Sequence, residues 1–266
     1  MDTDPSPIIT IATVTYNAED TLPATLESVA GQNYPHVEHL IVDGCSKDHT
    51  MELIHRYVDE NSRQSIPHDI RVIKEPDRGL YDAMNKALAL AQGDYICFLN
   101  AGDRLHAPDT LSRIADCIRT YNGTSERPGV VYGETDIVNR EGLFLRHRRL
   151  QAPDRLDWKC FRNGMLVCHQ SFYACTDLAR EINYNLKFRF SADFDWCIRV
   201  MKAAEQQEMP LHNTRLILTD YQNEGMTTRN HNRSLVERFR LMARHYGWLR
   251  TAGLHLRFVL RAVTHP

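Results

Sequence analysis

Short apolar runs alternate with helical patterns through the first half of the chain. The run at 8–15 is rich in β-branched residues and lies between Pro7 and Asn17, which is typical of a strand. The segment 19–31 has leucine and valine at helical spacing and stops at Gly31, which predicts a helix. The alternation continues, with predicted strands at 37–42, 70–74 and 94–99 and predicted helices at 46–61, 79–91 and 108–121.

This repeated strand–helix order predicts an α/β fold, with a mostly parallel central sheet and helices on both faces. After Gly123 the pattern is less regular, and we expect strands at 130–132, 166–173 and 217–221 and a helix at 193–204. We therefore divide the chain into an α/β domain over residues 1–228 and a basic, amphipathic, helical C-terminal tail over residues 229–266.

Composition and cysteine usage indicate an ordinary globular protein of the reducing cytoplasm. The hydrophobic content is 42%, the charged content is 25% and the net charge is −2, which implies no nucleic-acid partner. The seven cysteines are scattered and lack CxxC spacing, so neither a disulfide framework nor a zinc site is indicated. The acidic, proline-containing start is unlike a signal peptide, and no apolar run reaches the ~20 residues that span a bilayer.

The segment Tyr95-Ile-Cys-Phe-Leu-Asn-Ala-Gly-Asp103 combines a buried-strand pattern with an abrupt polar end. Such an end delivers oxygen ligands to the carboxyl edge of the sheet, where open α/β folds bind their ligands. Hard oxygen ligands suit Mg²⁺ or Mn²⁺, which neutralise a diphosphate. Asp103 is therefore a candidate metal ligand, and Asn100 can add a neutral oxygen.

The turn after the first strand excludes two common nucleotide-binding motifs. It reads Val14-Thr-Tyr-Asn-Ala-Glu-Asp20 and contains no glycine, so it is neither a dinucleotide-binding G-x-G-x-x-G loop nor a P-loop. The second strand ends at Asp43, followed by Gly44 and by Ser46, which we expect to cap the next helix. Asp43 can accept hydrogen bonds from a base or ribose, or can simply shape the turn.

Five segments together resemble the family 2 glycosyltransferases, a large inverting family with the GT-A fold that includes bacterial polysaccharide-biosynthesis enzymes. They follow the family's order and spacing across roughly residues 8 to 200. The segments are Val14-Thr-Tyr-Asn17, Val42-Asp-Gly-Cys-Ser-Lys-Asp48, Gly79-Leu-Tyr-Asp-Ala-Met-Asn85, Phe98-Leu-Asn-Ala-Gly-Asp103 and Ser191-Ala-Asp-Phe-Asp195. The resemblance implies transfer of a sugar from a nucleotide-sugar donor to a saccharide or lipid-linked acceptor.

The resemblance also implies roles for individual residues on the donor side. Thr15 and Asn17 would lie against the nucleotide, Asp43 would contact base or ribose, and Asn85 would face the nucleotide sugar. Many relatives have an Asp-x-Asp-Asp run where this chain has Asn100-Ala-Gly-Asp103, so the divalent-cation site would be reduced to one carboxylate.

On the acceptor side, Asp193 matches the family's general base, while Ala192 replaces a usual glutamate. Asp195 is the alternative base. We expect such a base to have a modestly raised pKa. His169, in a Cys168-His-Gln-Ser-Phe172 segment, would orient the diphosphate or acceptor or add a metal ligand, or would be an ordinary core histidine. Arg229, in the loop after Asp220, is a further candidate diphosphate contact.

The tail carries eight arginines and one acid, Glu237, from residue 229 onward. A basic amphipathic segment can lie on an anionic bilayer, or can be a helix docked on the domain with solvated arginines. We favour contact with the inner face of the cell membrane, because a lipid-linked acceptor would lie there. Two rival functions stay open at this point: a non-catalytic nucleotide-sugar or lipid-binding relative, and another metal-dependent nucleotide-handling enzyme.

Overall fold

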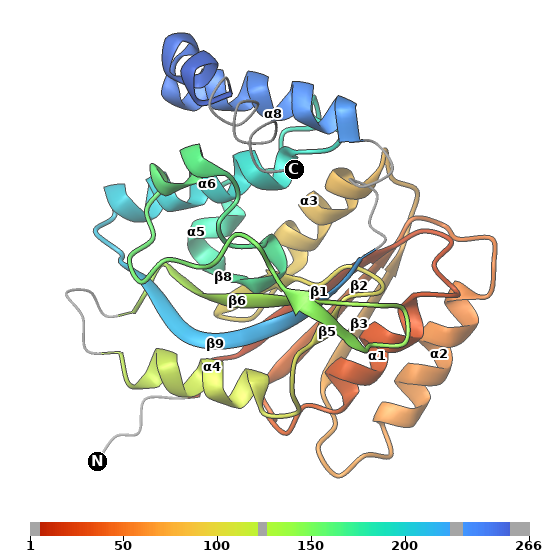
Figure 1. Cartoon of the computed structure of the whole chain (residues 1–266). Coiled ribbons are helices and arrows are strands. Elements are labelled where there is room, and N and C mark those ends of the chain that lie inside the picture. The colour runs from red at the N-terminus through yellow and green to blue at the C-terminus, as the bar shows by residue number, and fades with distance from the viewer. Residues whose placement is uncertain (1–5, 122–126, 224–230, 256–266) are drawn as a thin grey trace.

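The computed structural model describes residues 6–121, 127–223 and 231–255. One curved sheet runs through the molecule, with helices above and below it (Figure 1). The predicted α/β class with helices on both faces is confirmed. Helices α1, α2 and α4 cover one face of the sheet, and helices α3, α5 and α6 cover the other.

The first half of the chain forms the parallel part of the sheet, in the strand order β3-β2-β1-β4. Its strands are β1 (Ile9–Thr15), β2 (Val37–Asp43), β3 (Asp69–Lys74) and β4 (Tyr95–Phe98). The helices of this half are α1 (Leu22–Ala30), α2 (Thr50–Asn61), α3 (Leu80–Leu90) and α4 (Thr110–Arg119).

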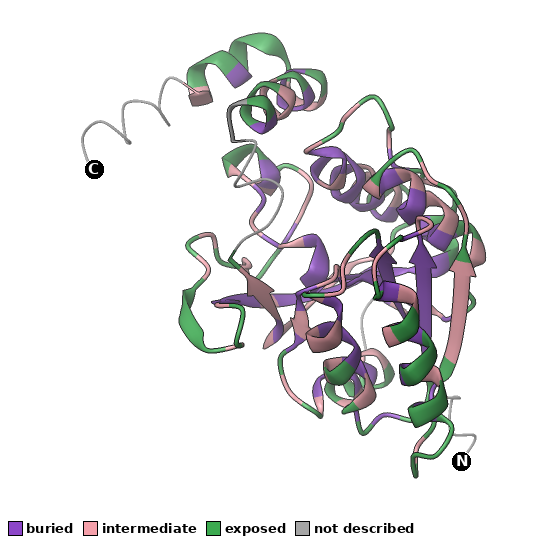
Figure 2. Ribbon diagram, turned by 90° about the vertical axis from the view of Figure 1, so that its right-hand side faces the viewer, coloured by how far each residue is buried: buried purple, intermediate pink, exposed green. Residues whose placement is uncertain are grey.

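Strand β2 shows how a central strand is buried on both faces of the sheet. All seven of its residues are buried. Ile41 packs with the apolar residues of α1 and α2, whereas Leu40 and Val42 belong to the main core, which includes α3. Because successive side chains point to opposite faces, both faces of β2 are buried, and its polar residues Glu38, His39 and Asp43 all have hydrogen-bond partners. Figure 2 shows the central strands as a buried layer.

The second half adds an antiparallel extension. Strand β8 (Phe172–Cys175) pairs antiparallel with β4, and β6 (Val130–Val138) pairs antiparallel with β8. Strand β9 (Leu211–Gln222) then runs parallel to β6. Two short strands complete the sheet: β5 (Arg104–Leu105) pairs with β9, and β7 (Phe144–His147) pairs with β6. The helices are α5 (Thr176–Arg180) and α6 (Ala192–Gln206).

Two sequence predictions of local structure are wrong, and both errors fall at the site edge. The expected strand over 166–173 is mostly a loop and a 3₁₀ turn at His169–Ser171, with β8 beginning only at Phe172. Ser46 does not cap a helix. Its backbone N–H and hydroxyl both donate to the Asp43 carboxylate, and α2 begins only at Thr50.

Helix α8 (His231–Tyr246) is packed against the domain, as the docked-helix alternative expects. Leu241 and Met242 join the main core. Glu237 accepts hydrogen bonds from the backbone N–H groups of Arg189 and Phe190, at 3.0 and 2.7 Å. Within the described ranges, no helix has the length and apolar character needed to cross a bilayer. The division of the chain at residue 228 stays a prediction.

Candidate active site

The carboxyl ends of β1, β2 and β4 lie side by side, because β1 pairs in parallel with both neighbours. Thr15 stands opposite Asp43 in the register of β1 with β2. Ligands of open α/β sheets bind beyond this edge. The strand ends and the loops that follow them hold five predicted residues: Thr15, Asn17, Asp43, Asn100 and Asp103.

The first group of these residues forms one hydrogen-bonded turn. Asp43 is fully buried and accepts from the Thr15 hydroxyl at 2.9 Å and from the backbone of Ser46 at 2.9 Å. Asn17 has a left-handed backbone, with φ of 48°, and its side-chain oxygen accepts from the backbone of Lys47 at 2.9 Å. The Asp43 carboxylate therefore shapes the site wall, and its predicted contact with base or ribose stays a prediction.

Tyr16 is a site residue that the sequence reasoning missed. It lies between Thr15 and Asn17 and is 59% exposed, although it directly follows a completely buried strand. An exposed aromatic ring at a ligand-binding edge offers a flat surface for stacking. The signal available in the sequence was an aromatic residue inside a polar strand-end turn.

Asp103 is buried just beyond β4, at 4% exposure. Its two carboxylate oxygens accept from the Gln170 side chain at 2.8 Å and from the backbone N–H of Gln222 at 3.0 Å. Burial raises the pKa of Asp103 to about 6, and these two hydrogen bonds offset only part of that rise. The positive φ of Gly102, 104°, lets the chain turn so that Asp103 points back into the protein.

A chain of polar contacts links Asn100 to Asp193, the candidate base. Asn100 Nδ2 lies 3.2 Å from His169 Nε2, and His169 Nδ1 lies 3.3 Å from Asp193 Oδ2. The Tyr81 hydroxyl donates to Asp193 Oδ1 at 3.1 Å. An Asn100 amide that donates to Nε2 leaves the Nδ1 proton of His169 for Asp193. The structure thus brings together three predicted residues from separate segments.

Asp193 lies in the first turn of α6 beside a second residue that the sequence reasoning missed, Arg238 of α8. Burial alone would raise the pKa of Asp193, but the hydrogen bond from His169 and the charge of Arg238 hold it below its usual range. The expected raised pKa is therefore wrong. Arg238 lies over the Phe194 ring at 5.0 Å and is more than 40 residues away in sequence, so no local motif marks it.

Asp195, the alternative base, is directed elsewhere. Its oxygens accept from Arg199 Nε at 2.8 Å and lie 2.7 Å from His245 Nε2 of α8. Burial raises its pKa, but these bonds to His245 and Arg199 outweigh burial and lower it. Residues two apart on a helix point to different sides. Asp195 therefore ties α6 to α8, whereas Asp193 joins the His169 cluster.

Both polar atoms of the Asn85 side-chain amide form hydrogen bonds within the protein. It donates to the Tyr184 carbonyl at 3.1 Å and accepts from the Tyr184 backbone N–H at 2.6 Å. The Tyr184 ring stacks on Tyr81, with centroids 5.5 Å apart. Asn85 thereby positions Tyr81, the hydrogen-bond donor to Asp193, and its predicted contact with the nucleotide sugar stays a prediction.

The residues around Asp103 fit a divalent cation in one specific respect. Asn100 Oδ1 is buried and has no hydrogen-bond partner, which leaves a neutral oxygen ligand close in sequence to the Asp103 carboxylate. Each carboxylate oxygen of Asp103 also keeps a second lone pair beyond the one hydrogen bond that it accepts from Gln170 or Gln222. Among the described residues, however, Asp103 belongs to no group of three His, Cys, Asp or Glu ligands. Arg229 lies outside the described residues.

The sequence and the fold of this chain are similar to those of known glycosyltransferases. The chain is 34% identical over 195 residues to a PGL/p-HBAD biosynthesis glycosyltransferase of Mycobacterium bovis (BCG / Pasteur), covering 73% of this chain and 70% of the relative. It is 38% identical over 99 residues to the putative teichuronic acid biosynthesis glycosyltransferase TuaG of Bacillus subtilis, covering 37% of each chain.

Solved structures share the fold at low sequence identity. TarS of S. aureus (residues 1–349, in complex with UDP) superposes with a TM-score of 0.68 at 16% identity, covering 97% of this chain and 72% of TarS. The mannosyltransferase PcManGT of Pyrobaculum calidifontis (with GDP-Man and Mn²⁺) gives 0.64 at 17% identity, covering 100% and 78%. The model of the family described as "Glycosyl transferase family 2" matches residues 10–189. The chain therefore belongs to glycosyl transferase family 2 and is a glycosyltransferase.

Proposed function

We propose that this enzyme transfers a sugar from a nucleoside-diphosphate donor to an acceptor hydroxyl, with inversion at the anomeric carbon. The observation that carries the proposal is the placement of Asp193. It is a partly buried carboxylate at the start of α6, fixed by Tyr81 and His169, and the Asn100–His169 contact links it to the strand end that carries Asp103. This arrangement supports a role for Asp193 as a base beside the expected donor diphosphate.

Asp193 acts in this proposal as the general base. The lowered pKa keeps its carboxylate ionised at neutral pH, so it is ready to accept a proton. As the acceptor oxygen attacks the anomeric carbon, its proton passes to Asp193 and the bond to the nucleoside diphosphate breaks. The leaving group departs from the opposite face with the bonding electron pair. His169 and Tyr81 keep the carboxylate aimed at the acceptor during this step.

The donor nucleotide would lie on the edge formed by β1 and β2. Tyr16 offers a ring for the base, and Thr15, Asn17 and Asp43 line the turn beneath it. Asp103, with the free oxygen of Asn100, would hold a divalent cation such as Mg²⁺ or Mn²⁺. When bound, that cation would neutralise the charge that develops on the diphosphate leaving group.

The acceptor is proposed by analogy with the names of the relatives. These names refer to PGL/p-HBAD and teichuronic acid biosynthesis. We infer that the acceptor is the glycan or lipid-linked intermediate of a cell-surface glycolipid or polysaccharide. No nucleic acid takes part in this proposal.

A panel of donors tests the proposed reaction. Incubating the protein with UDP-, GDP-, dTDP- and CDP-sugars and Mn²⁺ or Mg²⁺ should reveal one nucleotide that raises the melting temperature. Selective binding to the folded state adds about 2.7 kcal/mol of stability when the ligand is at 100 times its Kd. The same donor should slowly release its nucleoside diphosphate. Absence of both effects for every donor would contradict the proposed function.

We further propose that α8 and the helical residues 248–255 rest on an anionic membrane surface. Residues 233, 236, 240 and 244 fall on one face of α8 by their spacing, and all four are exposed. Three of them are arginines, and the following Trp248 and Leu249 are 65% and 92% exposed. The C-terminal helices at the top of Figure 2 are exposed over much of their surface. Arginines beside exposed apolar side chains favour anionic lipid headgroups.

Vesicle binding tests this surface. The wild-type protein should sediment with phosphatidylglycerol-containing vesicles and not with pure phosphatidylcholine vesicles. The variant Arg240→Glu/Arg244→Glu should lose most of this binding, since each basic residue near the surface contributes about 1 kcal/mol. Trp248→Ser should weaken it further. The exposed pair Arg56→Glu/Arg63→Glu, on and just after α2 and far from α8 in the fold, is the matched control. Equal sedimentation of all variants would exclude this membrane-binding surface.

A further inference from the structure

Three neighbouring strands place a histidine and two aspartates in one row. His147 of β7 is paired with Asp136 of β6, and Asp136 is paired with Asp220 of β9. Side chains of directly paired residues share one face of a sheet and lie close together. The chain thus sets two carboxylates opposite each other across the parallel pair β6–β9, an arrangement that like charges make unfavourable.

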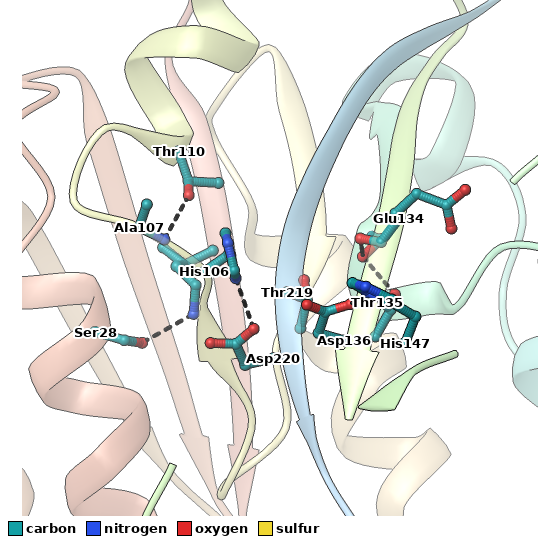
Figure 3. A network of polar contacts seen from close by, with 12 residues as sticks. Ser28, His106, Ala107, Thr110, Glu134, Thr135, Asp136, His147, Thr219 and Asp220 are labelled. Atoms are coloured by element: carbon teal, nitrogen blue, oxygen red, sulfur yellow. Dashed lines mark hydrogen bonds and ion pairs between the residues drawn. The ribbon is translucent and has the colours of Figure 1, made fainter. Parts of the chain in front are cut away.

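A second histidine, from the segment after β5, lies beside the same two aspartates. His106 follows β5 directly, and its Nδ1 lies 2.7 Å from Asp220 Oδ1. His147 Nδ1 lies 2.8 Å from Asp136 Oδ1. Figure 3 shows these two histidine–aspartate pairs beside β9. The ligand atoms of His106, Asp136 and Asp220 all fall within 4.8 Å of one another, the one such group of three or more found among the described residues.

Apart from the two histidines, no neighbouring cation among the described residues neutralises the carboxylates by ion pairing. Arg104 stands opposite Asp220 in the β5–β9 register, but its Nη2 donates to the Arg140 carbonyl at 2.9 Å. Within the described ranges, no lysine or arginine forms an ion pair with Asp136 or Asp220. Asp136 is only 4% exposed. Burying two facing carboxylates costs free energy unless a positive charge compensates them.

We propose that His106, Asp136 and Asp220 bind a divalent transition-metal ion such as Zn²⁺ or Mn²⁺, with His147 orienting the Asp136 carboxylate. This site is separate from the expected donor cation at Asp103. It lies on the opposite face of β6 and β9 from Thr135 and Thr219, which hydrogen-bond Ser171 and Gln170. The inference stands independently of the proposed reaction.

The ligand chemistry agrees with such an ion. One imidazole and two carboxylates are ligands common to zinc and manganese sites. Ligand bonds of about 2.0–2.2 Å place ligand atoms a little over 3 Å apart, so the present cluster needs only small side-chain shifts. Three protein ligands leave a position for water. A second hydrogen bond onto a ligating carboxylate, as His147 provides, is the usual outer support of a metal ligand.

A bound ion would connect segments that frame the candidate active site. His106 lies three residues after Asp103, and Asp220 lies two residues before Gln222, whose backbone N–H binds the Asp103 carboxylate. The ion would hold β5, β6 and β9 together at this point. Its role is therefore structural support of the strands around Asp103.

Metal titration without any nucleotide tests the site. The metal-stripped full-length protein is titrated calorimetrically with ZnCl₂ and with MnCl₂, and its melting temperature is followed in parallel. We expect one ion per chain and a rise in melting temperature. Asp136→Asn and Asp220→Asn should each lower the affinity more than tenfold, and His147→Gln should lower it about 10- to 100-fold. Asp103→Asn should bind the ion as the wild type does.

The variants also distinguish a metal site from two histidine–aspartate ion pairs that bind no metal. Without metal, Asp136→Asn should melt at or above the wild-type temperature, because it removes the repulsion between the carboxylates. With metal bound, the wild type should melt at a higher temperature than Asp136→Asn. If Asp136→Asn does not fold, Asp220→Asn, which removes the same repulsion at a partly exposed residue, supplies the same comparison. Absence of uptake in the wild type, or equal uptake by all the variants, would overturn the site. Loss of uptake only in Asp103→Asn would assign the ion to the donor site instead.

Discussion

The variant Asp193→Asn is expected to lose sugar transfer by about 10²- to 10⁴-fold in kcat, the usual contribution of a positioned general base. Asparagine keeps the size of the side chain but cannot take the acceptor proton. Donor binding should change little, because Asp193 acts on the acceptor. The measurement is steady-state transfer, together with the donor-induced rise in melting temperature.

Asp195→Asn is the matched control for this experiment. Asp195 sits two residues away, is also a carboxylate of α6 and is more deeply buried, and it is bound to Arg199 and His245. Removing its charge should destabilise the fold by weakening the tie between α6 and α8, since breaking a buried ion pair is costly. The folded fraction should keep kcat within about tenfold of the wild type. Near-normal transfer by Asp193→Asn, combined with an inactive but folded Asp195→Asn, would reverse the two roles.

The second large effect is expected from Asp103→Asn, which should lower kcat/KM for the donor at least about 100-fold, the usual loss when a group that stabilises leaving-group charge is removed. The rise in melting temperature produced by nucleotide with Mn²⁺ should also disappear. The fold should persist: an asparagine oxygen can still accept from Gln222, and the Gln170 amide can turn to accept from the new amide group.

The same variant has an unusual expected effect on stability. Burial raises the pKa of Asp103 to about 6 from an ordinary value of 3.8. Between roughly pH 4 and 6 the folded state therefore holds a proton that the unfolded chain has released, so stability falls as pH rises through this window. At neutral pH the ionised Asp103 costs up to about 3 kcal/mol in the ligand-free protein.

Asp103→Asn removes that cost, so without ligands it should melt above the wild type at neutral pH and close to it near pH 4. Melting curves of both proteins across this range check the sign. A variant that melts below the wild type at every pH would mean that the Asp103 charge stabilises the fold. In that case Asp103 would be a structural carboxylate, and its loss would not report on the donor site.

The parallel half of the fold could be predicted from the sequence because both faces of its sheet are covered. Strand β4, buried throughout, is an unbroken apolar run that can be read without knowledge of its partners. The 3₁₀ turn at His169–Ser171 could not be predicted in this way. Its residues are buried and follow an apolar run, so their composition resembles a strand, whereas contacts with distant residues such as Asn100 and Asp103 fix the backbone.

The candidate site was predictable where its residues follow strands and unpredictable where distant segments meet. Asp103 and Asp193 stand in local motifs, whereas Arg238 has only tertiary proximity to mark it. The row of His147, Asp136 and Asp220 depends on strand register, which includes irregularities in β6 that no pattern of letters reveals. Helical geometry alone, by contrast, already places Asp193 and Asp195 on different sides of α6.

The origin of Arg238 in α8 sets the order in which the active site can be assembled during synthesis. The donor edge, the base and its histidine partner all emerge from the ribosome before α8 does, because they precede it in the chain. A chain cut short before α8 would therefore hold Asp193 beside His169 but without Arg238, one of the groups that lower the Asp193 pKa. Synthesis of α8 is thus the step that completes the proposed catalytic centre, and products that lack this helix would carry the donor edge with an incomplete base.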